Sequence, residues 1–187
     1  MKKKIIIATA AASMIATPAF AGPTDESDVI VNASVAKECS IEDIGTIAIG
    51  DISINEAPGV DALQIVGETR QDSGRFWVSC NFTNSMTLST PTPLVSASAT
   101  ALLPTVEVGS QAFTDTIQYR LRAQNYKTSP YARSNGSGDG VTSTRSTGPI
   151  HEGISFRASV WGEDNVGQRP IAATDYTATA TVSMSAL

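Results

Sequence analysis

Few residues of this chain have the types and spacing that chemistry requires. It holds two cysteines, Cys39 and Cys80, and a single histidine, His151. Three readings are open for the two thiols: a metal site, a reactive thiol or a disulfide. Two Cys and one His cannot complete a four-ligand zinc site without carboxylates, so we disfavour the metal.

The remaining polar residues do not predict a catalytic centre. No nucleophile elbow, zinc-protease helix, Walker loop or dinucleotide fingerprint occurs. Asp43 and Asp51, and the neighbours Glu163 and Asp164, are explained as solvated turn residues. His151 follows a Gly-Pro pair, which predicts a surface turn. We therefore expect no enzyme activity and no cofactor. Of the three functional hypotheses that the sequence allows, an exported enzyme is the least favoured.

The first 21 residues have the pattern of a secretory signal peptide. Lys2–Lys4 form a basic region, Ile5–Ala16 an apolar region, and Ala19–Ala21 an A-x-A cleavage site. The apolar run is shorter than a membrane helix and no second one follows, so a membrane anchor is the weaker alternative. We expect an exported domain from Gly22 onward with no membrane span.

Export bears on the cysteines and on the charge. An oxidising compartment makes a Cys39–Cys80 disulfide the default expectation. Removing the signal peptide removes three of the 13 basic residues and none of the 18 acidic ones, which leaves a net charge of −8. An acidic chain without a basic stripe is a poor nucleic-acid ligand.

The elements that must position these residues are short and separated by turn formers. They predict an all-β fold, a β-sandwich of one domain, with no helix after residue 22. Trp77 and Trp161 are expected to pack in the core, a carbohydrate platform being the less favoured alternative. Lys127–Gly148 is predicted to be a long mobile loop. The expected strands are Asp28–Ile41, Ile44–Ile49, Leu63–Val66, Gly74–Phe82, Met86–Ser89, Ile117–Ala123, Ile154–Trp161 and Tyr176–Ala186.

The final predicted strand has the clearest period of two. Its apolar side chains face one way, and Thr and Ser face the other. We expect its backbone edge to be covered by an earlier segment or by another chain, because an open edge promotes aggregation. The apolar row is Tyr176, Ala178, Ala180, Val182, Met184 and Ala186, and the first five are the residues we expect to face a partner strand.

The segment before Cys39 alternates in the same way. From Asp28 to Val35, one face carries Val29, Val31, Ala33 and Val35. The mature chain thus combines a short polar leader, an amphipathic strand, a β-rich body and a second amphipathic strand.

The order of these motifs resembles the spore coat protein U family, the pilin subunits of archaic chaperone–usher systems. An N-terminal strand precedes a Cys-Ser-apolar step and a glycine-containing turn. A Val-Ser-Cys strand, a Tyr-centred middle strand and an alternating Tyr-Thr terminus follow. The matching segments are Val31–Val35, Cys39–Ile41, Ile44–Gly50, Trp77–Cys80, Ile117–Leu121 and Ala172–Val182.

The resemblance implies an immunoglobulin-like sandwich that lacks its last strand. Residues 22–35 would be the donor-strand extension and 36–187 the pilin domain. A periplasmic chaperone would fill the groove beside the C-terminal strand, and the N-terminal strand of the next subunit would replace it at an outer-membrane usher. The partners would be identical or related pilins in a surface fibre. The alternative is a secreted coat or adhesive sandwich that is complete by itself.

Overall fold

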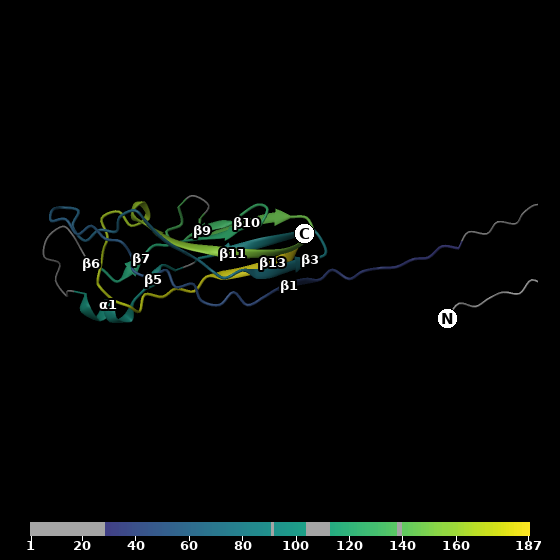
Figure 1. Ribbon diagram of the computed structural model, residues 1–187, viewed down its shortest axis with the longest axis horizontal. Helices are drawn as coiled ribbons and strands as arrows, with labels where there is room; N and C mark the ends of the chain where they lie inside the picture. The colour runs from purple at the N-terminus through teal and green to yellow at the C-terminus, as the bar shows by residue number, and fades with distance from the viewer. Residues whose placement is uncertain (1–28, 91, 104–112, 138–139) are drawn as a thin grey trace, which may run out of the picture. The chain divides into compact units, whose positions relative to one another are not determined.

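A computed structural model describes residues 29–90, 92–103, 113–137 and 140–187. The predicted signal peptide and Asp28 lie outside the described residues. The chain divides after Val35 into two units, and the second, Ala36–Leu187, forms the β-rich body. Figure 1 traces the strands of this body.

The body is mostly strands with very little helix, which confirms the all-β prediction. Helix is limited to the six residues of α1 (Ala97–Leu102) and the single 3-10 turn η1 (Gly162–Asp164) among the described residues. The strands are β1 (Cys39–Ile41), β2 (Glu68–Asp72), β3 (Phe76–Cys80), β4 (Asn84–Ser89), β5 (Leu94–Val95), β6 (Phe113–Thr114), β7 (Thr116–Ile117), β8 (Arg120–Gln124), β9 (Tyr131–Arg133), β10 (Thr142–Thr147), β11 (Ile150–Trp161), β12 (Arg169–Pro170) and β13 (Thr181–Ala186).

Two sheets contain most of these strands. The larger has the order β1-β3-β11-β8-β9, and β2 pairs with the distal half of β11, beyond the stretch that pairs with β3. The smaller has the order β10-β4-β13. Two short pairs, β12 with β6 and β5 with β7, stand apart from them. All pairs in the two larger sheets are antiparallel.

Both sheets contribute to one apolar core, because strands of each sheet bury apolar side chains in it. Phe76 and Val78 of β3 and Phe156 of β11 come from the larger sheet, and Met86 and Leu88 of β4 from the smaller. The Phe76 and Phe156 rings stack with centroids 5.1 Å apart. β11 spans 12 residues. One side of it pairs first with β3 and then with β2, and the other side pairs with β8.

The predicted disulfide is present and joins β1 to β3. Cys39 and Cys80 stand directly opposite in the antiparallel register and are 41 residues apart in the sequence. β1 has only three residues, so the bridge secures a strand that few backbone hydrogen bonds hold.

Several expected strands were wrong in extent. In the described part of Asp28–Ile41, residues 29–41, only Cys39–Ile41 is strand, and none of Ile44–Ile49 is. In the latter, Gly45 and Gly50 have positive φ of 67° and 80°, which interrupts extended backbone. Leu63–Val66 forms only an isolated bridge at Ile65, and β2 lies just beyond it.

Two further predictions were also wrong. Lys127–Gly148 is not one loop, since it contains β9 and β10. The expectation of no helix missed α1, where Ser96 is the N-cap and its Oγ accepts the Ala99 N–H at 2.9 Å. No helix of the described residues is long and apolar enough to cross a membrane.

Candidate functional site at the open flank

The C-terminal row leads into β13, an edge strand of the smaller sheet. From Tyr176 to Met184 the side chains alternate, with the apolar row half-buried against the core and the Thr and Ser residues exposed. Regular strand begins only at Thr181, so the expected strand Tyr176–Ala186 was too long at its start. Tyr176, Ala178 and Ala180 therefore precede the strand, and Val182 and Met184 lie within it.

One side of β13 is paired and the other is not. β13 pairs along its full length with β4, from Thr181 opposite Ser89 to Ala186 opposite Asn84. In the described part of the chain no strand pairs with its other side. The outward backbone groups of β13 therefore have no partner strand, while the apolar side chains beside them stay only half-buried.

Polar contacts anchor the chain just before this edge. Asp175 accepts hydrogen bonds from the Ser96 hydroxyl, from the Ser98 hydroxyl at 2.5 Å and from the Ser98 N–H at 3.1 Å. These bonds lower the pKa of Asp175 to about 2. Thr177 exchanges two backbone hydrogen bonds with Val95, at 2.9 and 3.0 Å. The edge thus starts from a fixed point at α1.

Tyr176 adds a half-buried anchor at the start of the row. Its hydroxyl donates to the Ile171 carbonyl at 2.8 Å. Burial raises the pKa of Tyr176, and the nearby carboxylates of Asp115 and Asp175 act in the same direction. The ring packs against the core while the hydroxyl stays satisfied.

A second apolar row lies on the segment 42–53. Ile44, Ile47, Ile49 and Ile52 are half-buried and pack against the same core as the C-terminal row. The segment is tied at one end by the Glu42 N–H to the Trp77 carbonyl. Sequence reasoning placed a strand near here but not a binding role. The alternate isoleucines Ile47 and Ile49 are the sequence pattern that could have revealed this row.

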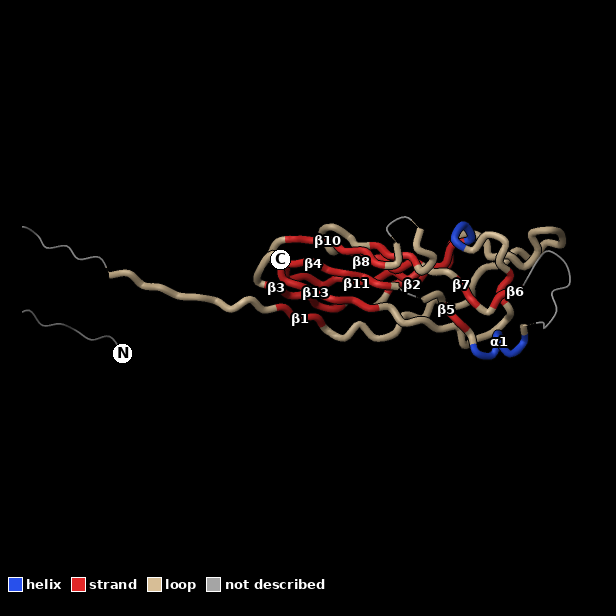
Figure 2. The backbone as a smooth tube through the Cα atoms, turned by 180° about the vertical axis from the view of Figure 1, so that it is seen from behind, coloured by secondary structure: helices blue, strands red, loops and turns tan. Residues whose placement is uncertain are grey.

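The backbone between the two ends of this segment is unpaired. The Val66 N–H donates to the Ser53 carbonyl at 3.0 Å, and this ties the far end. For residues 43–52, the only hydrogen bond among the described residues is the local one from the Gly45 N–H to Asp43 Oδ1. We call this segment and the outer edge of β13 the open flank. Figure 2 draws both along the body.

The open flank can accept an extended segment. It offers two sets of unpaired backbone groups beside two half-buried apolar rows. Those are the requirements for β-strand addition, in which backbone hydrogen bonds give affinity and alternate side chains give specificity.

The predicted donor residues belong to the first unit of the chain. Residues 29–35 form no regular secondary structure, so the expected N-terminal strand is not formed. Val29, Val31 and Val35 are exposed to 86%, 86% and 85%, and Ala33 is also exposed. When a partner covers apolar side chains that are this exposed, the free energy falls, so the segment favours association.

Two other expectations about polar and aromatic residues were wrong. His151 lies within β11 rather than in a turn, and its Nδ1 is 2.7 Å from Ser79 Oγ. Trp77 is half exposed instead of buried. Its side chain stands on the outer side of β3, because Phe76 and Val78 take the inward positions of that strand. Period-2 patterning alone could not assign which side faced the core.

Asp164 is not a solvated turn residue. Its side chain is only 5% exposed and forms an ion pair with the buried guanidinium of Arg120, which also pairs with Glu163. Burial alone would lower the pKa of Arg120, but hydrogen bonds to Asp164 and Glu163 outweigh it and raise the pKa. The guanidinium also lies over the Trp161 ring, 4.6 Å from its centroid. This cluster fixes β8 against the end of β11.

No group of three or more metal-ligating side chains occurs among the residues that the structure describes. The chain matches no protein-family model, and no curated protein matches it.

Proposed function

We propose that this chain is a structural subunit of a surface fibre and that it polymerises by β-strand addition between copies. The observation that carries the proposal is the open flank, where unpaired backbone lies beside half-buried apolar rows. An edge of this kind promotes association unless another segment covers it. The resemblance of the motif order to the spore coat protein U family supports the same reading.

The proposal includes a finer fold, an immunoglobulin-like β-sandwich with one strand missing at the open flank. Two features support it. The two larger sheets share one core, as the sheets of a sandwich do. In addition, the edge strands β1 and β13 are each paired on one side only, among the described residues. A single strand added between β1 and β13 would cover the free edges of both sheets.

The donor we propose is the segment 29–35 of another copy. Its apolar face carries three valines and one alanine, and burying them is worth roughly 5–6 kcal/mol before the cost of ordering the segment. Ladder hydrogen bonds to β13 add a modest further gain. The contact is directional, since donor and acceptor surfaces differ, so repeated contacts generate an open fibre.

The same surface accounts for the export partners we propose. A subunit with an uncovered apolar flank needs a protective strand before assembly, which a periplasmic chaperone supplies in the family it resembles. An outer-membrane usher would then exchange that strand for the next donor. Secretion would follow from the predicted signal peptide.

Val31→Asp tests the donor assignment. The substitution would place an unpaired charge in the acceptor's apolar flank, which the burial of the remaining side chains cannot offset. We expect assembly to fail, while the body still folds and still accepts a wild-type donor. Size-exclusion chromatography and electron microscopy of the exported chain would measure this. Asn32→Asp, with the same charge on the opposite face, is the matched control and should assemble.

Normal assembly of the Val31→Asp chain would reject this donor. A stable monomer of the wild-type chain that resists polymerisation would instead support the alternative, a coat or adhesive protein that is complete by itself.

A further inference from the structure

The outer face of β1, β3 and β11 holds a cluster of side chains that strand addition does not use. The register aligns Ser40 with Ser79, and Ser79 with His151. In the next row, the Glu42 N–H donates to the Trp77 carbonyl, and Trp77 stands opposite Gly153. With Arg75, which bonds to Gly153, these residues form what we call the Trp77 patch. Its members are Ser40, Glu42, Arg75, Trp77, Ser79 and His151.

The centre of the patch is a fixed aromatic surface. Trp77 is 50% exposed, an unusual position for the largest apolar side chain. The ring of His151 stacks on it with centroids 4.9 Å apart and planes 21° from parallel. The 2.7 Å contact between His151 Nδ1 and Ser79 Oγ holds the imidazole in place. The rings are therefore ordered before any ligand arrives, which lowers the entropic cost of binding.

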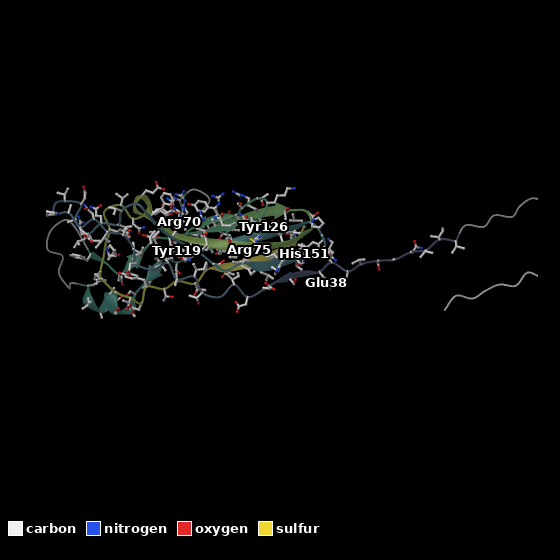
Figure 3. All side chains as sticks on the ribbon, viewed as in Figure 1. Glu38, Arg70, Arg75, Tyr119, Tyr126 and His151 are labelled. Carbon is white, nitrogen blue, oxygen red and sulfur yellow. A yellow bond between two sulfur atoms is a disulfide. The ribbon has the colours of Figure 1, made fainter. Side chains whose placement is uncertain are left out.

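Charged groups of both signs border the indole. Glu42 Oε2 accepts the Trp77 N–H at 2.7 Å, and its other carboxylate oxygen has no hydrogen bond among the described residues. Arg75 donates to the Gly153 carbonyl at 3.0 Å. It lies close over this glycine, where an added Cβ would stand 3.3 Å from the Arg75 Nε. Within the patch itself, one carboxylate and one guanidinium balance each other, so this part of the surface does not favour a charged ligand. Figure 3 labels Arg75 and His151.

A shallow depression continues the patch along the disulfide. Its volume is about 510 Å³, and Ser79 and His151 form part of its wall. Glu38, Asn81 and Pro149 form the rest, together with the bridged cysteines and their neighbours. Asn81 is fixed there by hydrogen bonds with the Glu38 N–H at 2.9 Å and the Ala36 carbonyl at 2.7 Å. The patch therefore adjoins a mainly apolar hollow that has a few polar groups in its wall and is held by a covalent bridge.

We propose that the Trp77 patch and this depression bind a neutral saccharide. A pyranose ring presents C–H groups on one face, which the exposed indole can cover, and hydroxyl groups at its rim. Those hydroxyls need both donors and acceptors, and the patch supplies them through Arg75, Glu42, Ser40 and the imidazole. Few polar groups placed around an apolar surface are typical of small-ligand sites. The inference does not depend on fibre formation.

The two tryptophans allow a direct test on the full exported chain. Cellotetraose and the β-1,4-linked tetramer of N-acetylglucosamine are the probes, followed through the two indole N–H signals in nitrogen–proton NMR spectra. We expect the Trp77 signal to shift on titration and the Trp161 signal to stay, because the Trp161 N–H is held by Ser159 at 3.0 Å. The Val31→Asp chain, which should not assemble, should give the same titration, so failure of this inference and of the fibre proposal are distinguishable.

Substitutions complete the test. Trp77→Ala should weaken binding at least about tenfold, whereas Phe113→Ala, which removes another exposed aromatic ring (42%) outside the patch, should leave it unchanged. Thermal unfolding would verify that both variants fold. No shift of the Trp77 signal with either probe up to about 10 mM would overturn the inference, as would full affinity in the Trp77→Ala chain. A Trp77→Ala chain that changes only self-association would assign the patch to a contact between copies instead.

Discussion

The two edges of the smaller sheet differ in how they are connected to the larger sheet. β4 is the centre of the smaller sheet, and β10 and β13 pair with the same six residues of it, Asn84–Ser89. On the β10 side, hydrogen bonds from β9 connect the larger sheet to β10 and the residues just before it. The Tyr131 N–H of β9 donates to Ser143 Oγ at 3.1 Å and the Arg133 N–H to the Gly140 carbonyl at 2.9 Å. We call this the closed flank.

At the open flank nothing comparable joins the two sheets along the length of β13 among the described residues. The difference cannot arise from β4, which both flanks share. It arises because β9 and β10 follow one another in the sequence, whereas β1 and β13 are far apart in the chain. A sheet edge that short-range connections do not cover is left for another chain.

Ala180→Asp should have the largest effect, the complete loss of the acceptor role. Ala180 belongs to the half-buried C-terminal row and directly precedes β13, so a strand added along the open flank would bury the charge. The variant should still donate its own N-terminal segment. Mixed with Val31→Asp, which still accepts, it should form pairs and no longer assemblies, which analytical ultracentrifugation can count. Thr179→Asp, one residue away and exposed, is the control; fibres from Ala180→Asp would contradict the open flank as the acceptor.

Removing the disulfide should have the next largest effect. Replacing both Cys39 and Cys80 by alanine should lower the free energy of unfolding by roughly 4 kcal/mol, the chain-entropy value for residues 41 apart. Denaturant unfolding measures it, with the reduced wild-type chain as the comparison. A loss below about 1 kcal/mol would mean that β1 stays paired with β3 without the bridge.

A serine pair compares the two flanks directly. Ser143 of β10 is 2% exposed and its hydroxyl accepts the Tyr131 N–H, so Ser143→Ala leaves a partly buried donor unsatisfied and should cost about 1–3 kcal/mol. Ser183 of β13 is exposed, and Ser183→Ala should stay within about 0.5 kcal/mol. Equal losses in denaturant unfolding would remove the energetic distinction between the flanks.

Acid should loosen the anchor of the open flank with a small effect. The folded-state pKa of Asp175 is lowered to about 2, so its stabilising contribution is complete above the ordinary value of 3.8 and is lost as the pH falls from 3.8 through 2. Asp175→Asn should therefore reduce stability at neutral pH and flatten the pH dependence in that range. Thermal unfolding between pH 2 and 5 measures this; an unchanged slope would mean that the serine hydrogen bonds do not hold Asp175.

The sequence alone determined the local facts that depend on periodicity and on counting. Alternation from Tyr176 to Met184 assigned the inward row correctly, because a strand edge against a core has only two sides. With only two cysteines and a predicted export signal, the pairing of Cys39 with Cys80 needed no geometry. The turn-rich spacing of short apolar runs was enough for the all-β class.

Only the tertiary structure decided what covers each edge and which way the ambiguous side chains point. Trp77 and His151 sit in strands whose two faces are both apolar enough to allow either orientation, and packing of Phe76 and Val78 turned them outward. Asp164 looked like a turn residue until the fold brought Arg120, 44 residues away, against it. Whether β13 had a neighbour on its free side depended on contacts distant in sequence, which no local pattern contains.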